Sequence, residues 1–176
     1  LRERGMNPLP VHAASLKDPL AAAILAETFA AAPPEVILNT TGFALSAPGA
    51  ATDRGPFRDT DAPLLQVVFA GSDRDSWETG ANGLSARDIA MNVALPEVDG
   101  RILSRAVSFK GAAQRDAASE TDVVAYEPVA DRIAFTAQLA QSWARLRTTS
   151  VADRRVAIIL ANYPNRDGRI GNGVGL

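Results

Sequence analysis

Short apolar runs that alternate with helical patterns constrain the fold of this chain more than any other feature of its sequence. Strands buried on both faces of a parallel sheet read as near-continuous runs of Val, Ile, Leu and Phe, whereas helices repeat apolar residues every three or four positions. The candidate strands are residues 7–13, 36–39, 64–70, 102–109, 123–126 and 156–161. The candidate helices are residues 19–32, 72–80, 85–91 and 128–147. This alternation predicts an α/β fold with an open, mostly parallel sheet and flanking helices, as in Rossmann- or flavodoxin-like three-layer proteins.

Local signals mark several element ends. Asp18 followed by Pro19 favours a helix start, because the Asp side chain can accept a hydrogen bond from the first turn and Pro lacks a donor that would otherwise go unpaired there. Ser72 and Ser85 are the expected N-caps of two short helices. Residues 111–121 are polar and should form an exposed turn or excursion. We therefore allow for a β-hairpin excursion next to the strand at 102–109.

Composition excludes several classes of function. The formal net charge of −2 argues against nucleic-acid binding, which normally needs a basic excess. The chain has no Cys, and His12 is its only His, so it offers neither a thiolate site nor a His-rich metal site. No apolar run approaches the ~20 residues of a membrane span, and the N-terminus does not resemble a signal peptide. We expect no membrane partner and a cytoplasmic location.

The length of 176 residues suits one α/β domain, or a domain fragment, across residues 1–176. The chain begins LRERGMNPLP, without an initiator Met, and its last residues are GRIGNGVGL, where a helix is expected to start. We therefore expect an internal fragment of a longer, multidomain polypeptide.

The segment LPEVDGR holds the first candidate site. If the backbone is extended here, Glu97, Asp99 and Arg101 project to the same side. A carboxylate at the edge of a sheet can take a proton from a substrate nitrogen or guide a borderline cation. The alternative is a polar turn, in which Asp99 and Gly100 make the bend and Arg101 forms an ion pair.

Two further loops follow candidate strands, where α/β proteins hold their ligands. The first loop offers Asn39, Thr40 and Gly42, which could contact a carboxylate or amide ligand or simply cap the next element. The second loop is rich in Gly and Asn, and its candidate substrate-binding residues are Asn162, Asn165, Arg166 and Gly168. It lacks the GxxxxGK[ST] pattern of a phosphate-binding loop, so a substrate-facing loop is favoured over nucleotide binding.

Several long blocks carry a family resemblance. They are PPEVILNTTGFA at 33–44, PLLQVVFAGS at 63–72, GLSARDIAMNVALPEVDGRILSRAVSFK at 83–110 and DRRVAIILANYPNRDGRIGNGVGL at 153–176. In this order they resemble an internal piece of the CobN-type large subunits of cobaltochelatase. The related magnesium chelatase H-type subunits are similar around LPEVDG but diverge more in the tail. The resemblance covers nearly the whole chain apart from 111–121.

The resemblance implies a function in metal insertion. Large subunits of this family bind the tetrapyrrole, here hydrogenobyrinic acid a,c-diamide, and insert Co²⁺ as a substrate during aerobic cobalamin (vitamin B12) biosynthesis. The resemblance implies that ATP is used by separate AAA+ partner subunits and is not bound here, and that an isolated fragment is inactive as a ligase. Glu97 is then expected to handle protons and to contact the metal transiently. Asp99 and Arg101 would orient Glu97 or bind a peripheral carboxylate of the substrate.

Two alternatives stay open at this point. The chain could belong to a magnesium chelatase H-type subunit that binds a porphyrin. It could instead be a structural module whose loops bind the AAA+ partner subunits rather than the tetrapyrrole. The remainder of the large subunit is an expected partner in each case.

Overall fold

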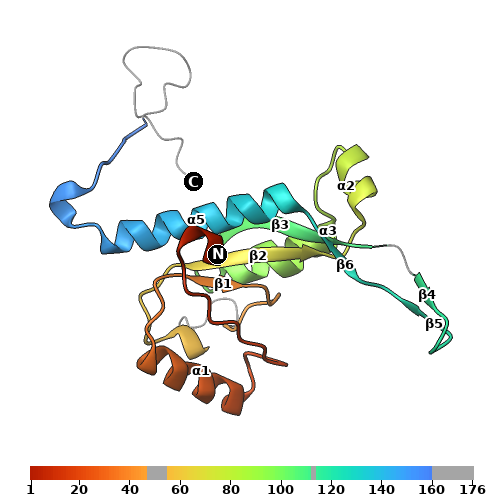
Figure 1. Ribbon diagram of the computed structural model, residues 1–176, viewed down its shortest axis with the longest axis horizontal. Helices are drawn as coiled ribbons and strands as arrows, with labels where there is room; N and C mark the ends of the chain where they lie inside the picture. The colour runs from red at the N-terminus through yellow and green to blue at the C-terminus, as the bar shows by residue number, and fades with distance from the viewer. Residues whose placement is uncertain (47–54, 112–113, 160–176) are drawn as a thin grey trace.

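The computed structural model describes residues 1–46, 55–111 and 114–159, and at its centre lies a curled four-stranded sheet (Figure 1). Strands β1 (Ile37–Asn39), β2 (Leu64–Ala70) and β3 (Ile102–Lys110) are parallel, and β6 (Tyr126–Pro128) pairs antiparallel to β3. The order across the sheet is β1-β2-β3-β6. The predicted α/β fold with a mostly parallel sheet is confirmed.

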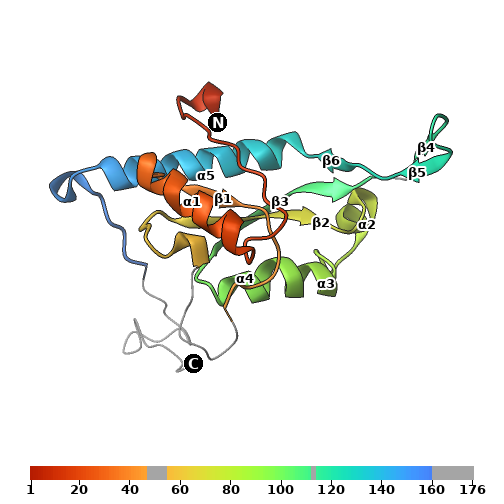
Figure 2. The ribbon, with the colours of Figure 1, turned by 90° about the horizontal axis from the view of Figure 1, so that it is seen from below.

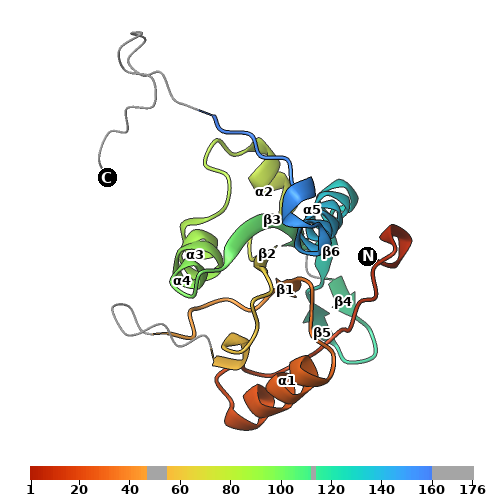
Figure 3. The same cartoon turned by 90° about the vertical axis from the view of Figure 1, so that its left-hand side faces the viewer.

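Helices cover both faces of this sheet. The helix α5 (Ala130–Thr148) lies along one face. On the opposite face lie α3 (Ala86–Ile89), a π-helical turn (Ala90–Ala94) and α4 (Leu95–Glu97), as Figures 2 and 3 show. The remaining helices are α1 (Pro19–Ala31) and α2 (Arg74–Thr79), with short 3₁₀ turns at Arg2–Arg4, Gly55–Phe57 and Val151–Asp153.

The core lies around β2 and β3. The run at 64–70, which became β2, is the clearest strand expected to be buried on both faces. Leu65, Val68 and Ala70 of β2 and Phe109 of β3 are completely buried. Burying a side chain the size of Leu, Val or Phe is worth about 1.5–3 kcal/mol relative to exposure, so Leu65 and Val68 make β2 an anchor of the sheet. At the sheet edge, α1 packs against the 3₁₀ turn Gly55–Phe57, where the rings of Phe29 and Phe57 stack with centroids 6.1 Å apart.

An exposed hairpin projects away from the sheet, as Figure 1 shows at the far end of β3 and β6. Its strands are β4 (Gln114–Asp116) and β5 (Thr121–Val123), which pair antiparallel in a separate two-stranded sheet. All of their residues are exposed, which confirms the predicted polar hairpin excursion. The predicted strand at 123–126 is split, because β5 ends at Val123 and β6 begins at Tyr126.

Local capping follows the sequence with one correction. The Asp18 carboxylate accepts a hydrogen bond from the Ala21 amide at 2.9 Å, as predicted. Ser85 caps α3 as predicted. The cap of α2 is Asp73 rather than Ser72, because the Asp73 carboxylate accepts the Ser76 amide at 2.8 Å.

Two predicted strands are wrong over the residues described. Residues 7–13 form no ladder, since Pro8 and Pro10 remove two backbone donors from a seven-residue run. Residues 156–159 are irregular, and Ile159 is 95% exposed. An apolar run becomes a strand by pairing with a neighbour, and no strand of the described chain pairs with these residues. Residues 160–161 lie outside the described part.

Candidate functional site

The LPEVDGR segment is a helix end followed by a tight turn, not an extended chain. The Gly100 amide donates to the Glu97 carbonyl at 2.9 Å, and the Arg101 amide donates to the Pro96 carbonyl at 3.4 Å. Gly100 adopts a φ of 72°, in the left-handed region that glycine enters without a steric penalty. Of the two alternatives for this segment, the extended chain that would project Glu97, Asp99 and Arg101 to one side is therefore not adopted. The chain reverses at Gly100 before β3 begins.

Asp99 and Arg101 form a buried ion pair. The Arg101 Nη2 lies 2.9 Å from the Asp99 Oδ2, and their side chains are 1% exposed or less. Burial lowers the pKa of the Arg101 guanidinium from its usual value, although the charge and hydrogen bond of Asp99 act in the opposite direction. The turn predicted as the alternative for this segment, with Arg101 in an ion pair, matches this geometry.

The Asp99 carboxylate also holds the loop that follows β1. Its Oδ2 accepts the Leu45 amide at 2.7 Å, and its Oδ1 accepts the Ser46 amide at 3.0 Å. Arg101 Nη1 donates to the Thr41 carbonyl at 2.9 Å. The ion pair thus ties the β1 loop to the turn before β3, over a sequence separation of more than fifty residues.

Two amide side chains complete this buried network. The Asn39 Nδ2 donates to the Gln66 Oε1 at 3.0 Å, and the Gln66 Nε2 donates to the Thr41 carbonyl at 3.0 Å. Arg101 Nη1 also donates to the Gln66 Oε1, at 3.2 Å. The sequence analysis did not single out Gln66, although one polar residue inside the run LLQVVFA was a signal that it needed buried partners. The Asn39 side chain is engaged within the protein, and its predicted contact with substrate stays a prediction.

Glu97 has a different environment from Asp99. Its side chain is exposed at the end of α4, and no hydrogen bond or ion pair engages its carboxylate within the part of the chain that the structure describes. Arg101 neutralises Asp99 inside the protein, so Glu97 is the carboxylate of this segment that reaches solvent. Such a group can accept a proton or contact a cation.

The loop after β1 packs closely on the π-helical turn. A Cβ on Gly42 would lie 2.9 Å from the Asn92 Oδ1 and 3.1 Å from the Met91 carbonyl oxygen, so a larger residue needs a shift of the neighbouring chain. The next amide, of Phe43, donates to the Met91 carbonyl at 2.8 Å. Gly42 therefore acts here through close packing, while the Thr40 side chain is exposed. Contacts of either residue with substrate stay a prediction.

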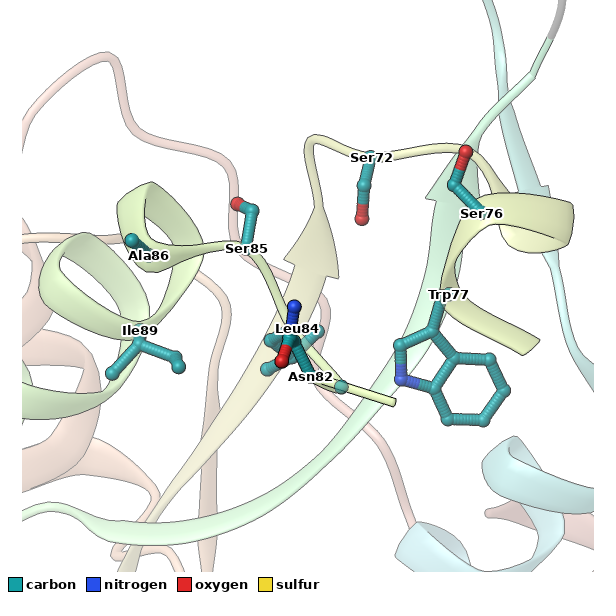
Figure 4. A pocket seen from close by; sticks show the side chains of 9 residues that line it. Ser72, Ser76, Trp77, Asn82, Leu84, Ser85, Ala86 and Ile89 are labelled. Carbon is teal, nitrogen blue, oxygen red and sulfur yellow. The ribbon is translucent and has the colours of Figure 1, made fainter. Parts of the chain in front are cut away.

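Two hollows lie near the ends of the strands. One of about 850 Å³ lies between the N-terminal segment, α1, β1 and α5, and Asn39, Thr40 and Thr41 line part of it. A second, of about 440 Å³, lies beyond the end of β2. Figure 4 shows Trp77 and Ile89 on opposite sides of it, with Asn82 between them.

The second predicted loop lies beyond the described residues, which end at Ile159. Its candidate residues Asn162, Asn165, Arg166 and Gly168 all fall outside that range. Within the described ranges, no group of three or more His, Cys, Asp or Glu residues is arranged to hold a metal ion. No helix among the described residues is long and apolar enough to cross a membrane.

Comparison with known proteins identifies the family. A family model described as CobN/Magnesium Chelatase matches residues 1–176. The chain is 56% identical over 178 residues to the aerobic cobaltochelatase subunit CobN of a Sinorhizobium species, covering all of this chain and 14% of the relative. It is 49% identical over 176 residues to the subunit of the same name from Pseudomonas aeruginosa, with the same coverage. The H-type magnesium-chelatase subunit of Chlorobaculum parvum is 30% identical over 140 residues, or 74% of this chain and 10% of the relative.

A solved structure agrees with these sequences. The catalytic subunit of cobaltochelatase from Mycobacterium tuberculosis superimposes with a TM-score of 0.75 at 34% identity, covering 99% of this chain and 14% of that one. The chain thus spans about one seventh of the length of these relatives. The chain belongs to the CobN/magnesium chelatase family.

Proposed function

We propose that this chain is part of the tetrapyrrole-binding large subunit of an ATP-dependent cobaltochelatase. The subunit would insert Co²⁺ into hydrogenobyrinic acid a,c-diamide in aerobic cobalamin biosynthesis. The observation that carries the proposal is the exposed Glu97 carboxylate, which stands at the end of α4 beside a buried, neutralised ion pair. The identity of 56% to a CobN subunit over the whole chain supports the cobalt branch over the magnesium branch, where identity is 30%.

The reaction explains why one exposed carboxylate is useful. A ring nitrogen of the corrin loses its proton as the metal enters, and a carboxylate beside the macrocycle can accept that proton. Because Arg101 neutralises Asp99, Glu97 presents an uncompensated charge to an approaching cation. Co²⁺ is a substrate in this scheme, and a single carboxylate oxygen would guide it toward the ring without holding it as a permanent ligand.

Other components complete the enzyme. We propose that separate AAA+ subunits use ATP, in keeping with the lack of a GxxxxGK[ST] segment in this sequence. The remainder of the large subunit would supply the rest of the substrate cavity, so this stretch alone should not insert metal. We retain the expectation of a cytoplasmic location and of no nucleic-acid or membrane partner.

The test is Glu97→Gln in the full-length subunit, assayed with its ATPase partners for Co²⁺ insertion. Substrate binding is followed in parallel by fluorescence quenching. We expect insertion to fall about 10²- to 10⁴-fold, the usual effect of losing a general base, while tetrapyrrole affinity is kept. Glu27→Gln is the matched control, because Glu27 is also an exposed helical Glu but lies on α1.

Other outcomes point elsewhere. Unchanged insertion by Glu97→Gln would reduce this segment to a structural turn. Preferred binding of a porphyrin and Mg²⁺ by the wild-type subunit would favour the magnesium chelatase alternative. Lost association with the ATPase partners, with substrate binding intact, would favour a docking module.

A further inference from the structure

Phe43 is the most unusual residue near the candidate site. Its φ is 60°, in the left-handed region that glycine enters freely and bulky residues rarely enter. Its side chain is also 56% exposed. A strained backbone persists only where the surrounding structure holds it, and residues of this kind cluster at active sites and ligand contacts.

On its N-terminal side, the backbone of Phe43 is fixed by contacts with the π-helical turn. The Phe43 amide donates to the Met91 carbonyl at 2.8 Å, and Met91 belongs to the π-helical turn Ala90–Ala94. Gly42 packs directly on the same turn, so closely that a Cβ would require a neighbouring atom to shift. π-Helical turns are rare and are frequently found at functional sites.

Contacts on the C-terminal side hold the loop equally firmly. The Asp99 carboxylate accepts the amides of both Leu45 and Ser46, at 2.7 and 3.0 Å. Asp99 is itself fixed by its buried ion pair with Arg101. The backbone of Phe43 therefore lies between two anchored points.

The same anchor also carries Glu97. Glu97 precedes Asp99 by two residues, at the end of the helical segment that includes the π turn and α4. Asp99 and Arg101 thus connect the loop with the exposed Phe43 ring to the segment with the exposed Glu97 carboxylate. Within the described residues the Phe43 ring is in no stacked or tilted contact with another ring.

We propose that the Phe43 ring packs against the face of the tetrapyrrole and sets the position of the macrocycle relative to Glu97. This inference rests on the proposed function. The inner conjugated ring of such a macrocycle exposes a π surface, and aromatic side chains stack on surfaces of this kind in offset geometry. The anchored loop fixes the backbone that carries the ring, so binding has less backbone to order. Phe43 is thus a substrate-contacting residue distinct from the proton-handling Glu97.

The test uses the full-length subunit and hydrogenobyrinic acid a,c-diamide, with affinity measured by fluorescence quenching. Phe43→Ala should weaken binding about five- to hundredfold, the range for loss of an aromatic stacking contact, and Phe43→Trp should preserve it. Phe69→Leu is the control, because Phe69 is likewise an exposed Phe, at 42%, but lies on β2 in contact with Tyr126.

Phe43→Gly separates a substrate contact from a structural role. Glycine relieves the strain at this φ, so the thermal unfolding midpoint should stay at or above that of the wild type while affinity falls as in Phe43→Ala. A lowered midpoint in both variants would mean that the ring packs against another part of the subunit, and would overturn the inference. Binding by Phe43→Ala within twofold of the wild type would also overturn it and leave the proposed function standing. A wild-type subunit that does not bind this tetrapyrrole would instead refute the proposed function.

Discussion

Replacing Asp99 with Asn tests whether the buried ion pair is what holds the loop after β1. Asn has nearly the same shape as Asp, but only one of its two terminal atoms accepts hydrogen bonds. In the wild type, the two Asp99 oxygens accept from the Leu45 amide, the Ser46 amide and Arg101 Nη2. In either orientation of the Asn amide, its NH₂ group faces at least one of these donors. Arg101, whose side chain is 0% exposed, also loses the negative charge that compensates its own.

The expected loss can be estimated from these contacts. Removing one member of a buried ion pair typically costs about 3–5 kcal/mol, because the other charge is left buried without compensation. Each 1.4 kcal/mol is a factor of about ten in an equilibrium constant. If the loss acts on the opening of the loop, the amides of Leu45 and Ser46 should exchange with solvent about a hundredfold to a few thousandfold faster.

Hydrogen–deuterium exchange in the full-length subunit measures this effect directly. The amides of α5 around Ala140 serve as an internal reference, since Ala140 is completely buried and lies far from Asp99 in the chain. Asp73→Asn is the matched control, because Asp73 also accepts a backbone amide but does so at an exposed helix cap. An increase of less than about tenfold at Leu45 and Ser46 in Asp99→Asn would refute the argument that this ion pair anchors the loop.

Two further predictions concern the joints of the fold. Arg147 at the end of α5 donates to the Asp61 carboxylate at 2.8 Å, and this hydrogen bond, followed by the Arg147 charge, lowers the pKa of Asp61 below its usual 3.8. Because the pKa is lower in the folded state, the stabilisation is present above the unfolded-state pKa and is lost as pH falls through the folded value. The difference in thermal midpoint between wild type and Arg147→Gln should therefore shrink below about pH 4, and a difference that grows there would contradict the assignment. Gly100→Ala should destabilise the turn before β3 by about 1–2 kcal/mol in chemical denaturation, because the φ of 72° is unfavourable for Ala although no atom lies within 4 Å of the added Cβ. Gly100→Asn should lose less, and equal stability of the Ala variant and the wild type would exclude backbone strain as the reason for glycine here.

Local signals made much of the fold predictable. The apolar run at 64–70 became β2, and the Asp18–Pro19 pair started α1, because burial and capping depend on neighbouring residues in the sequence. For the Glu97 segment the sequence left an extended chain and a polar turn open, and hydrogen bonds to the Pro96 and Glu97 carbonyls with the left-handed Gly100 close the turn. The strand predicted at 156–161 failed over the described residues for another reason, since an apolar run needs a neighbouring strand that a single sequence does not identify.

The buried network could not be predicted, because it depends on strand register. Asn39 lies directly opposite Gln66 in the parallel pairing of β1 with β2. Leu65, the next residue back in β2, pairs on its other side with Ile102, directly after Arg101. The three polar side chains meet only once these registers are set, and no spacing in the sequence reveals them. The positive φ of Phe43 is equally hidden, because its loop is held by hydrogen bonds to Met91 and Asp99, which are distant in sequence.

The structure also separates two carboxylates that look equivalent in the sequence PEVDGR. Asp99 is neutralised by Arg101 and both of its oxygens accept backbone amides, so it acts on the loop that carries Phe43. Glu97 is exposed and is the carboxylate of this pair that can meet a substrate nitrogen or an incoming cation. If Phe43 positions the macrocycle, loosening the loop by Asp99→Asn should act mainly on tetrapyrrole affinity, whereas Glu97→Gln should act mainly on the rate of Co²⁺ insertion. Asp99→Asn would then mainly raise KM, and Glu97→Gln would mainly lower kcat. A loss of rate in Asp99→Asn as large as that in Glu97→Gln, at unchanged affinity, would instead mean that the ion pair serves the chemistry directly.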